Sequence, residues 1–335
     1  MLRFTELPFR DWTVQTNSTQ PPNPRLGSTE IPEPDYNLGV GSEPHGEQTA
    51  EMIVELERLI EEESPDVVLL YGDTNSTLAG TVAGSKMDPL VVHVEAGPRS
   101  HNRDMPEEIN RILTDHGSDL LLAPSQDAVN HLDDEGQSDR TVATGDVMYD
   151  AVLEVRGRAA TASTILDRLS IEPGEFILST VHRAKNTDER ERLQSIFEAL
   201  RDTDQPVILP LHPRTESRLR DYDMWEFAND CVEIIDPLDY VDFIRLLDTA
   251  KCIATDSGGI QKEAFFLDTF CVTLRDETEW VETVDAGWNT LVGADYDKIT
   301  TALDRDWVPP EQKPEPYGDG NAARAVRETL EEYVS

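Results

Sequence analysis

Apolar runs and helix-period segments alternate along most of this chain, which predicts a parallel α/β fold. Continuous runs of Val, Ile and Leu are typical of strands that are buried on both faces of a sheet. They predict strands at residues 66–72, 90–95, 119–123, 141–144, 176–181, 206–210, 231–235, 251–255 and 270–274. Apolar residues that recur every three or four positions predict helices from 45 and 75 and over 107–116, 125–133, 160–169, 188–201, 239–248, 259–266 and 320–333. Strict alternation of this kind favours parallel sheets with helices on both faces.

The pattern divides into two halves near Glu154, which predicts two domains with a cleft between them. Four strands fall in the first half and five or six in the second. Residues 1–44 are rich in Pro and Asn and carry no sustained period, so no regular element is predicted there. The first domain would then lack the opening βα unit with which a doubly wound nucleotide domain normally starts.

Two helices carry local patterns that lead to specific expectations. Asn75 or Ser76 is expected to cap the helix that follows the first strand. In the helix at 107–116, Ile109, Ile112 and Leu113 are expected to face the core. Both expectations rest on local pattern alone.

Composition narrows the class of protein without changing the predicted fold. The chain has 335 residues, enough for two domains of ordinary size. No apolar run reaches the roughly 18 residues of a membrane span, and no signal-peptide pattern opens the sequence. The three cysteines lie in or beside apolar runs, so we expect buried free thiols in a reducing cytoplasm. No spacing of Cys or His is typical of a metal site.

The formal net charge of −38 is a second constraint. Such a field opposes nucleic-acid binding. The acids are spread over every predicted helix, and the basic residues are mostly Arg, with only six lysines. We interpret this as adaptation to high salt, where screening weakens self-repulsion, with an ordinary acidic protein as the alternative.

Acidic residues follow two predicted strands at the sheet edge where ligands of α/β proteins usually bind. The run DVVLLYG is followed by Asp73, LVVHV ends directly on Glu95, and Pro106-Glu107-Glu108 opens a helical pattern. Asp73 could instead cap the next helix, and Glu107 suits an ordinary first helical turn. Glu95 has no evident capping partner. Three such carboxylates could serve general acid–base chemistry.

A second constellation lies in the second half, in TDSGGIQKEA at 255–264. Glycines at a helix start let the backbone approach an anion, although a tight turn that only aids packing explains them equally well. Glu263, one turn on, could accept a hydrogen bond from a ribose. Basic residues near other strand ends could converge on the same ligand: Arg99, Arg111, His182, Arg183, His212, Arg214 and Arg275. A lone His such as His182 is more often a capping or core residue.

Taken together, segments in every part of the chain after residue 30 resemble the non-hydrolysing UDP-N-acetylglucosamine 2-epimerase family. They are IPEPDYNLGVGSEPHGEQTAEM, VVLLYGDTNSTLAG, HVEAGPRSHNRDMPEEINRILTDH, TVHRAKNTDERERL, HPRT, IDPLDYVDF, DSGGIQKEAFFL, LRDETEWVETVDAGWNTLVG and PYGDGNAA. The resemblance covers about residues 31–335 and implies two Rossmann-like domains in the glycosyltransferase-B arrangement. The implied parts are a non-matching segment at 1–30, domains at 31–154 and 155–317, and a helix within 318–335 that packs back on the first domain.

The resemblance implies a cofactor-free interconversion of UDP-N-acetylglucosamine and UDP-N-acetylmannosamine by elimination and re-addition of UDP. By match to the family's motifs, the catalytic candidates are Asp73, Glu95, Glu107 and His182. The candidates for substrate binding are Arg111, Arg183, His212, Arg214, Phe243, Ser257, Gly258, Gly259 and Glu263. Ser257 to Gly259 would hold the diphosphate, Glu263 the ribose and Phe243 the uracil. No metal or nucleic acid is expected, and the family implies a homodimer and a role in cell-surface polysaccharide precursors.

Departures from the family pattern keep alternatives open. Residues 1–30 match neither its Gly-x-Arg-Pro-Glu turn nor its Thr-Gly-Gln-His motif, so a truncated, inactive nucleotide-sugar binder is one alternative. Lys185 replaces a common acid and Leu238 a common Gln. Trp280 stands where many members have Arg, as in relatives that act on UDP-2,3-diacetamido sugars, so an epimerase of such a sugar is a second alternative. A retaining glycosyltransferase is a third, and it would not explain the three acids.

Overall fold

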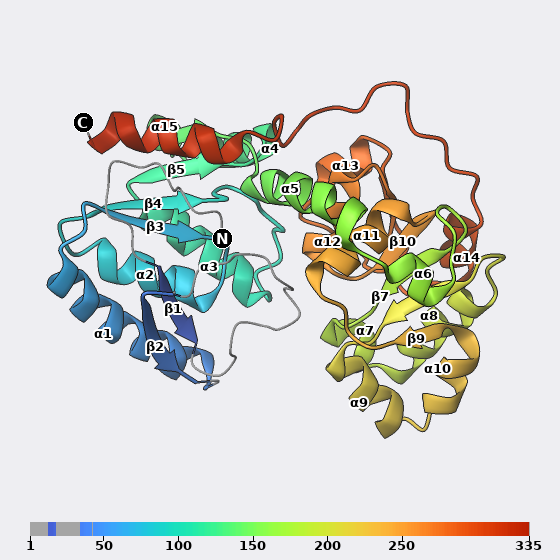
Figure 1. The fold of residues 1–335 in the computed structure, drawn as a ribbon. Coiled ribbons are helices and arrows are strands. Elements are labelled where there is room, and N and C mark those ends of the chain that lie inside the picture. The colour runs from blue at the N-terminus through green and yellow to red at the C-terminus, as the bar shows by residue number, and fades with distance from the viewer. Residues whose placement is uncertain (1–12, 18–33, 42, 335) are drawn as a thin grey trace. The chain divides into compact units, whose positions relative to one another are not determined.

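The computed structural model describes residues 13–17, 34–41 and 43–334, which form two compact units. Unit 1 comprises the described residues up to Asp150 together with 315–334, and unit 2 comprises residues 151–314. Each unit holds a parallel sheet flanked by helices (Figure 1). The predicted fold class, two parallel α/β units, is confirmed.

The main sheet of unit 1 has four parallel strands, in the order β3 (Val67–Tyr71), β4 (Leu90–Val94), β5 (Leu120–Ala123) and β6 (Thr141–Ala143). Helix α1 (His45–Glu63) precedes β3, and α2 (Asn75–Gly84), α3 (Pro106–Gly117) and α4 (Gln126–Asp134) connect the strands, with a 3-10 turn at Ser138–Arg140 before β6. These elements lie within a few residues of their predicted positions. Continuous apolar runs identified them because β4 and β5 are buried almost throughout.

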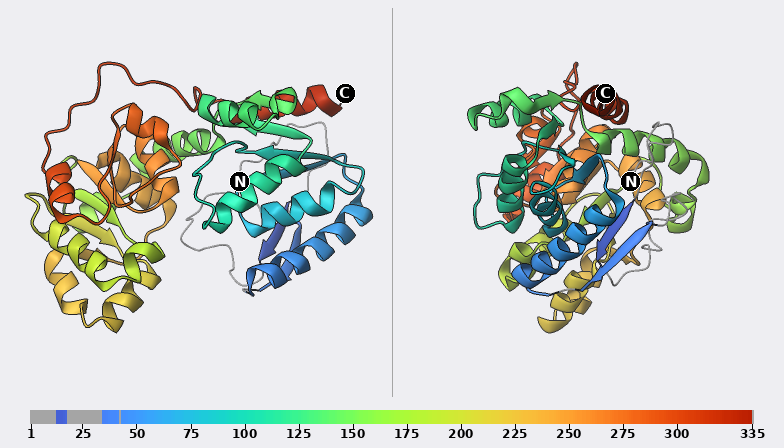
Figure 2. Two further views of the ribbon diagram at one scale, coloured as in Figure 1. Left: turned by 180° about the vertical axis from the view of Figure 1, so that it is seen from behind. Right: turned by 90° about the vertical axis from the view of Figure 1, so that its left-hand side faces the viewer.

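The two faces of this sheet are covered by different helices, because successive strand residues point to opposite sides. The face that includes Val92 and Leu122 packs against Val326 and Leu330 of the C-terminal helix α15 (Ala322–Val334), which lies along the sheet in Figures 1 and 2. The carboxylate of Asp150 accepts from the first two backbone amides of α15, at 3.0 and 2.8 Å, and so caps this helix.

Helix α2 approaches the opposite face closely through its small residues. A Cβ at Gly84 would lie 2.8 Å from Val91, so this position has no room for any side chain. The residue before α2 is Thr74, which makes no side-chain capping bond. The prediction of Asn75 or Ser76 as the cap was therefore wrong, by one residue for Asn75 and by two for Ser76.

Two short strands lie where no element was predicted. β1 (Val14–Asn17) and β2 (Tyr36–Val40) form a separate two-stranded parallel sheet, with Val14 opposite Tyr36. Val40 packs against Met52 of α1 and Ala79 of α2, which explains why β2 is ordered despite its Asn and Gly. Within the part of the chain that the structure describes, no strand pairs with the outer edge of β3.

Helix α3 presents a polar face to the interior, contrary to the prediction. Its buried residues are Glu108, Asn110, Arg111, Thr114 and Asp115. Ile109 and Ile112 are only half-buried, and Leu113 is 49% exposed. The predicted inward face was wrong because ion pairs and hydrogen bonds, described below, fix this helix against the end of the sheet.

Unit 2 contains one parallel sheet of six strands. Their order is β12 (Asn289–Leu291), β11 (Phe270–Thr273), β10 (Cys252–Thr255), β7 (Ile177–Thr180), β8 (Val207–Pro210) and β9 (Glu233–Ile235). The largest core cluster joins Leu193 and Phe197 of α8 (Arg190–Arg201) to Ile177 and Val272. Cys252 and Cys271 are buried free thiols and Cys231 is partly buried.

The remaining helices of unit 2 include several that the sequence pattern did not predict. α11 (Tyr240–Thr249) and α12 (Gly258–Phe266) match predictions, whereas the predicted helix at 160–169 is divided between α5 (Val147–Ala162) and α6 (Ile165–Leu169). The predicted helix at 188–201 is likewise preceded by a separate turn, α7 (Ala184–Thr187). The unpredicted helices are α9 (Pro213–Asp221), α10 (Trp225–Cys231), α13 (Val281–Asp285) and α14 (Tyr296–Leu303).

Candidate functional site

The carboxyl ends of β3 and β4 bring Asp73 and Glu95 together in unit 1. Both follow parallel neighbouring strands, in which Tyr71 lies opposite Val94. A Cβ built on Gly72 would lie only 3.9 Å from Oε2 of Glu95, so the Glu95 carboxylate lies beside the turn that carries Asp73. Glu95 is half-buried and adopts a φ of +70°, in the left-handed region that residues other than glycine rarely occupy. Such a conformation at a strand end is typical of functional sites.

Arg111 links two carboxylates at this edge. Its Nε donates to Oδ2 of Asp73 and its Nη1 to Oε2 of Glu108, both at 2.9 Å. Asn110 of the same helix donates to the backbone carbonyl of Asp73 at 2.9 Å. The side chain of Arg111, predicted to bind substrate, is therefore directed at Asp73, and Asp73 is not the cap of α2.

Glu107 and Glu108 have different surroundings although they are adjacent. Glu107, the predicted catalytic residue, lies exposed in the first turn of α3. Glu108 is 1% exposed and accepts from the backbone amides of Ser100 and His101, each at 2.9 Å. The sequence pattern gave no sign of this buried role, because Glu at either position suits a helix start.

Asp256 organises the corresponding edge of unit 2. It follows β10, is fully buried, and its carboxylate accepts from the backbone amides of His182 and Arg183 at 3.0 Å. Asn186 donates to the same carboxylate at 3.1 Å and to the carbonyl of Leu274 at 2.9 Å. Asp256 and Asn186 thus hold the His182-Arg183 turn, although neither was among the predicted site residues. The available signal was the position of Asp256 at a strand end, directly before Ser257.

His182 and His212 stack at the ends of β7 and β8, with ring centroids 5.1 Å apart. Burial, together with the positive charge of Arg183, lowers the pKa of His182 despite the opposing effect of Asp256, so the ring is neutral at pH 7. His212 accepts from the amide of Arg214 and caps α9. The guanidinium of Arg214 is exposed and pairs with Asp188 at 2.6 Å.

The predicted diphosphate turn begins α12, in line with the expectation for this segment. Gly258 is the first residue of that helix and Ser257 is its N-cap. A Cβ on Gly258 would lie 2.4 Å from Oε1 of Glu279, so a side chain here would require the Glu279 carboxylate to move. Glu279 pairs with Arg275 at 2.9 Å, and both side chains are less than one-tenth exposed. A helix start with small residues is a suitable environment for an anion, although here the Glu279 carboxylate lies beside it and pairs with the cation of Arg275.

Glu263 lies on α12 and is 8% exposed. Tyr240, the first residue of α11, donates a hydrogen bond to its carboxylate at 2.7 Å. Burial raises the pKa of Glu263 to about 7, against the opposing effects of Tyr240 and Lys262. Phe243 is partly buried on the same helix as Tyr240.

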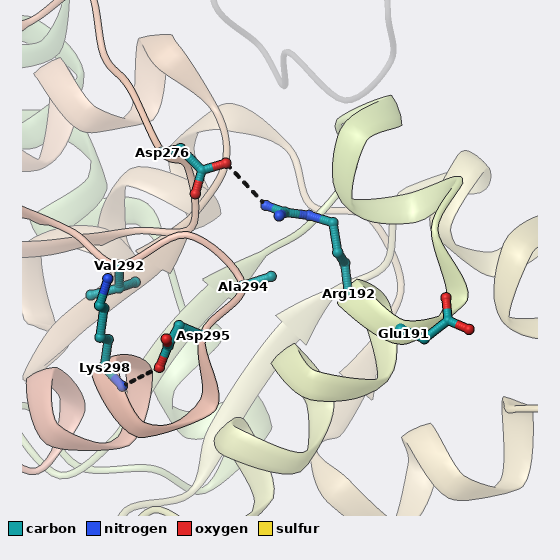
Figure 3. A pocket seen from close by; sticks show the side chains of 7 residues that line it. All are labelled: Glu191, Arg192, Asp276, Val292, Ala294, Asp295 and Lys298. Carbon is teal, nitrogen blue, oxygen red and sulfur yellow. Dashed lines mark hydrogen bonds and ion pairs between the residues drawn. The ribbon is translucent and has the colours of Figure 1, made fainter.

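A cavity of about 380 Å³ lies in unit 2 beside α8 and α14 (Figure 3). It is lined by Glu191, Arg192, Asp276, Val292, Ala294, Asp295 and Lys298. None of the predicted site residues lines it. Acids and bases alternate around it, and Asp276 pairs with both Arg192 and Lys185, so it offers no net positive site for a phosphate.

The described residues contain no cluster of His, Cys, Asp or Glu that could hold a metal ion. Over the same residues, no helix has the length and apolarity needed to cross a membrane.

Comparisons with known proteins give consistent results. The family model described as UDP-N-acetylglucosamine 2-epimerase matches residues 18–331. A Methanococcus maripaludis protein named UDP-N-acetylglucosamine 2-epimerase homolog is 46% identical, over 90% of this chain and 85% of that protein. The UDP-2,3-diacetamido-2,3-dideoxy-D-glucuronate 2-epimerase of Pseudomonas aeruginosa is 45% identical over 90% and 84%. The crystal structure of the Methanocaldococcus jannaschii UDP-GlcNAc 2-epimerase with UDP-GlcNAc and UDP superposes with a TM-score of 0.81 at 40% identity, over 90% of this chain and 85% of that one.

Proposed function

The chain belongs to the UDP-N-acetylglucosamine 2-epimerase family, and from this premise we propose that it interconverts UDP-N-acetylglucosamine and UDP-N-acetylmannosamine. The observation that carries the proposal is the placement of Asp73 and Glu95 side by side at the carboxyl edge of a parallel sheet. Inversion at C2 requires a base and an acid close to one carbon atom, and this edge supplies both from neighbouring turns.

The proposed reaction proceeds by elimination and re-addition, without a cofactor. A carboxylate removes the C2 proton, the electron pair forms a C1–C2 double bond, and UDP departs with the electrons of the C1–O bond. UDP then returns to C1 while a proton reaches C2 from the opposite face. Asp73, Glu95 and Glu107 are the proposed acid and base groups in unit 1. Arg111 supports this assignment because its Nε donates to Oδ2 of Asp73 and fixes the position of that carboxylate at the sheet edge.

Residues of unit 2 are proposed to hold UDP. The hydroxyl of Ser257 and the backbone amides of Gly258 and Gly259 would donate hydrogen bonds to the diphosphate at the start of α12. The basic residues that follow β7 and β8 would assist them, and these are His182, Arg183, His212 and Arg214. A neutral His182 can donate one hydrogen bond to the leaving phosphate. Glu263 would accept from the ribose, and Phe243 would contact the uracil.

Proton NMR of UDP-N-acetylglucosamine incubated with the protein in D2O tests the reaction directly. The expected result is the appearance of the manno epimer with deuterium at C2, because the proton that returns comes from solvent. Hydrolysis or transfer without inversion would overturn the proposal. Binding of UDP without deuterium incorporation would instead identify an inactive nucleotide-sugar binder.

A second candidate substrate is a UDP-2,3-diacetamido sugar. It rests on the 45% identity to the Pseudomonas aeruginosa enzyme, which is close to the 46% identity to the Methanococcus maripaludis UDP-N-acetylglucosamine 2-epimerase homolog. Trp280 also supports this substrate, because it stands where many members of the family have Arg, as in relatives that act on such sugars. It is 8% exposed and lies near the turn at Gly258. Rates of C2 exchange measured for both sugars under one condition decide between them, and the faster substrate is the one assigned.

The proposal extends to the compartment, the oligomeric state and the pathway of the protein. We expect a cytoplasmic homodimer, adapted to high salt, that supplies precursors of cell-surface polysaccharide. The half-exposed apolar residues Ile109, Ile112 and Leu113 on α3 are suited to a subunit contact. Sedimentation of the Leu113→Glu variant tests this surface: it should be monomeric where the parent is dimeric, and an unchanged dimer would place the contact elsewhere.

A further inference from the structure

A buried imidazole–carboxylate pair lies directly beneath the edge that carries Asp73 and Glu95. His93 of β4 and Asp115 of α3 are both fully buried. Nδ1 of His93 lies 2.6 Å from Oδ1 of Asp115, and Nε2 lies 2.8 Å from the backbone carbonyl oxygen of Gly72. The pair therefore touches the residue immediately before Asp73.

The partners of His93 determine where its protons are. The carbonyl oxygen of Gly72 can only accept, so Nε2 carries a hydrogen. Burial raises the pKa of Asp115, but His93 and Arg99 outweigh it and hold that pKa below its usual range, so Asp115 is an ionised acceptor. Nδ1 of the same ring faces this carboxylate, so His93 bridges Asp115 and the Gly72 carbonyl.

The carboxylate extends the contact to the second turn. Oδ2 of Asp115 accepts from the backbone amide of Gly97 at 3.2 Å, two residues after Glu95, and from Nη2 of Arg99 at 2.7 Å. Arg99 is in turn held by both oxygens of Glu135 at 2.8 Å. The sequence made Arg99 a candidate donor to a ligand. In the structure its side chain is buried and pairs with Asp115 instead.

Glu95 has a backbone conformation that needs such support. Gly72, Glu95 and Gly97 all have φ between +66° and +94°. A Cβ on Gly97 would lie 2.4 Å from the carbonyl oxygen of Ala128, so this turn is also tightly enclosed by α4. A residue with a side chain, such as Glu95, persists in this region only where surrounding contacts hold it, whereas glycine adopts it freely. One buried pair makes contacts to the turn on each side.

We propose that His93 and Asp115 are positioning residues that hold Asp73 and Glu95 at the distance required for proton transfer at C2. This inference rests on the proposed epimerase function, since it assigns the pair a role in that reaction. Neither residue reaches the edge itself, so the pair acts through the Gly72 carbonyl and the Gly97 amide. Because a displacement of about 1 Å in a catalytic group can cost about 100-fold in rate, loss of either contact should lower the turnover strongly.

Two isosteric variants separate the contacts. In His93→Gln the amide nitrogen can take the place of Nε2 and keep the bond to Gly72, whereas in His93→Asn it can take the place of Nδ1 and keep the bond to Asp115. Thr114→Val is the matched control, because Thr114 is fully buried beside Asp115 and its hydroxyl has no hydrogen-bond partner in the described structure. Asp115→Asn provides a second route should the His93 variants fail to fold.

The measurements are deuterium incorporation at C2, KM for the nucleotide sugar, UDP affinity and amide hydrogen exchange. We expect each His93 variant and Asp115→Asn to lose about 100-fold in kcat, with KM and UDP affinity within about twofold of the parent. Amides of residues 95–97 should exchange faster in His93→Gln and Asp115→Asn, which lose the contact between His93 and Asp115, and Thr114→Val should match the parent. Folded variants with kcat within about threefold of the parent would overturn the inference. A parent that binds UDP but incorporates no deuterium would instead refute the proposed function.

Discussion

Replacing Glu95 with glycine should abolish catalysis and yet stabilise unit 1 relative to its alanine counterpart. The backbone of Glu95 has a φ of +70°. A residue with a Cβ pays about 1–2 kcal/mol for this conformation, whereas glycine adopts it freely. Glycine also gains about 0.5–1 kcal/mol of conformational freedom in the unfolded chain, which opposes the effect. The difference predicts that Glu95→Gly is more stable than Glu95→Ala by about 0.5–1 kcal/mol.

The alanine variant is the appropriate reference because both substitutions remove the carboxylate and every contact beyond Cβ. Calorimetry at high salt should place the melting transition of Glu95→Gly about 1–4 °C above that of Glu95→Ala for a unit of this size. Exposed Glu51 within α1 provides a control pair in a right-handed conformation. There glycine should be less stable than alanine by about 1 kcal/mol. The same order at both positions would refute the left-handed conformation of Glu95.

Three further predictions concern chemistry and conditions. Glu95→Gln should abolish deuterium incorporation at C2 and leave UDP affinity within about tenfold, or about 1.4 kcal/mol; exchange equal to the parent would exclude Glu95 from the mechanism. The folded state raises the pKa of Glu263 to about 7, so its contribution to the unfolding free energy is complete below about pH 4.5 and is lost as pH rises to about 7. Thermal melts of Glu263→Gln should therefore decline less from pH 5 to pH 8 than those of the parent, and parallel curves would contradict the raised value. With a net charge of −38, circular dichroism should show loss of structure at low salt, where the Debye length grows from about 3 Å at 1 M to about 10 Å at 0.1 M; a flat response would argue against salt adaptation.

The sequence predicted the strands well because a strand that is buried on both faces is a continuous run of apolar residues. β4 and β5 are examples, since every residue of β5 is buried and apolar. Short elements left no such signal: β12 has three residues and buries only Asn289, and α13 has five residues. Parallel topology was enough to bring Asp73 and Glu95 to one edge. The left-handed turn at Glu95 was not predictable, because it depends on contacts with residues far along the chain.

The error on α3 has a different origin. Periodicity identifies an amphipathic helix but assumes that the apolar side faces inward. In α3 the inward side carries Glu108, Arg111 and Asp115, whose partners come from other segments of unit 1. No local pattern distinguishes these residues from an ordinary solvated face.

The polar side of α3 that packs against the rest of unit 1 also affects when, during folding, the protein becomes active. A collapsing chain gathers apolar surface without regard to geometry, and α3 has little apolar surface to contribute on the side that must dock. Buried charges are favourable only when their partners are already in place, and a missing partner costs several kcal/mol. The carboxylate edge should therefore assemble only in the last packing step of unit 1. A compact intermediate with a formed sheet would have no activity, so the return of activity on refolding should trail the return of secondary structure.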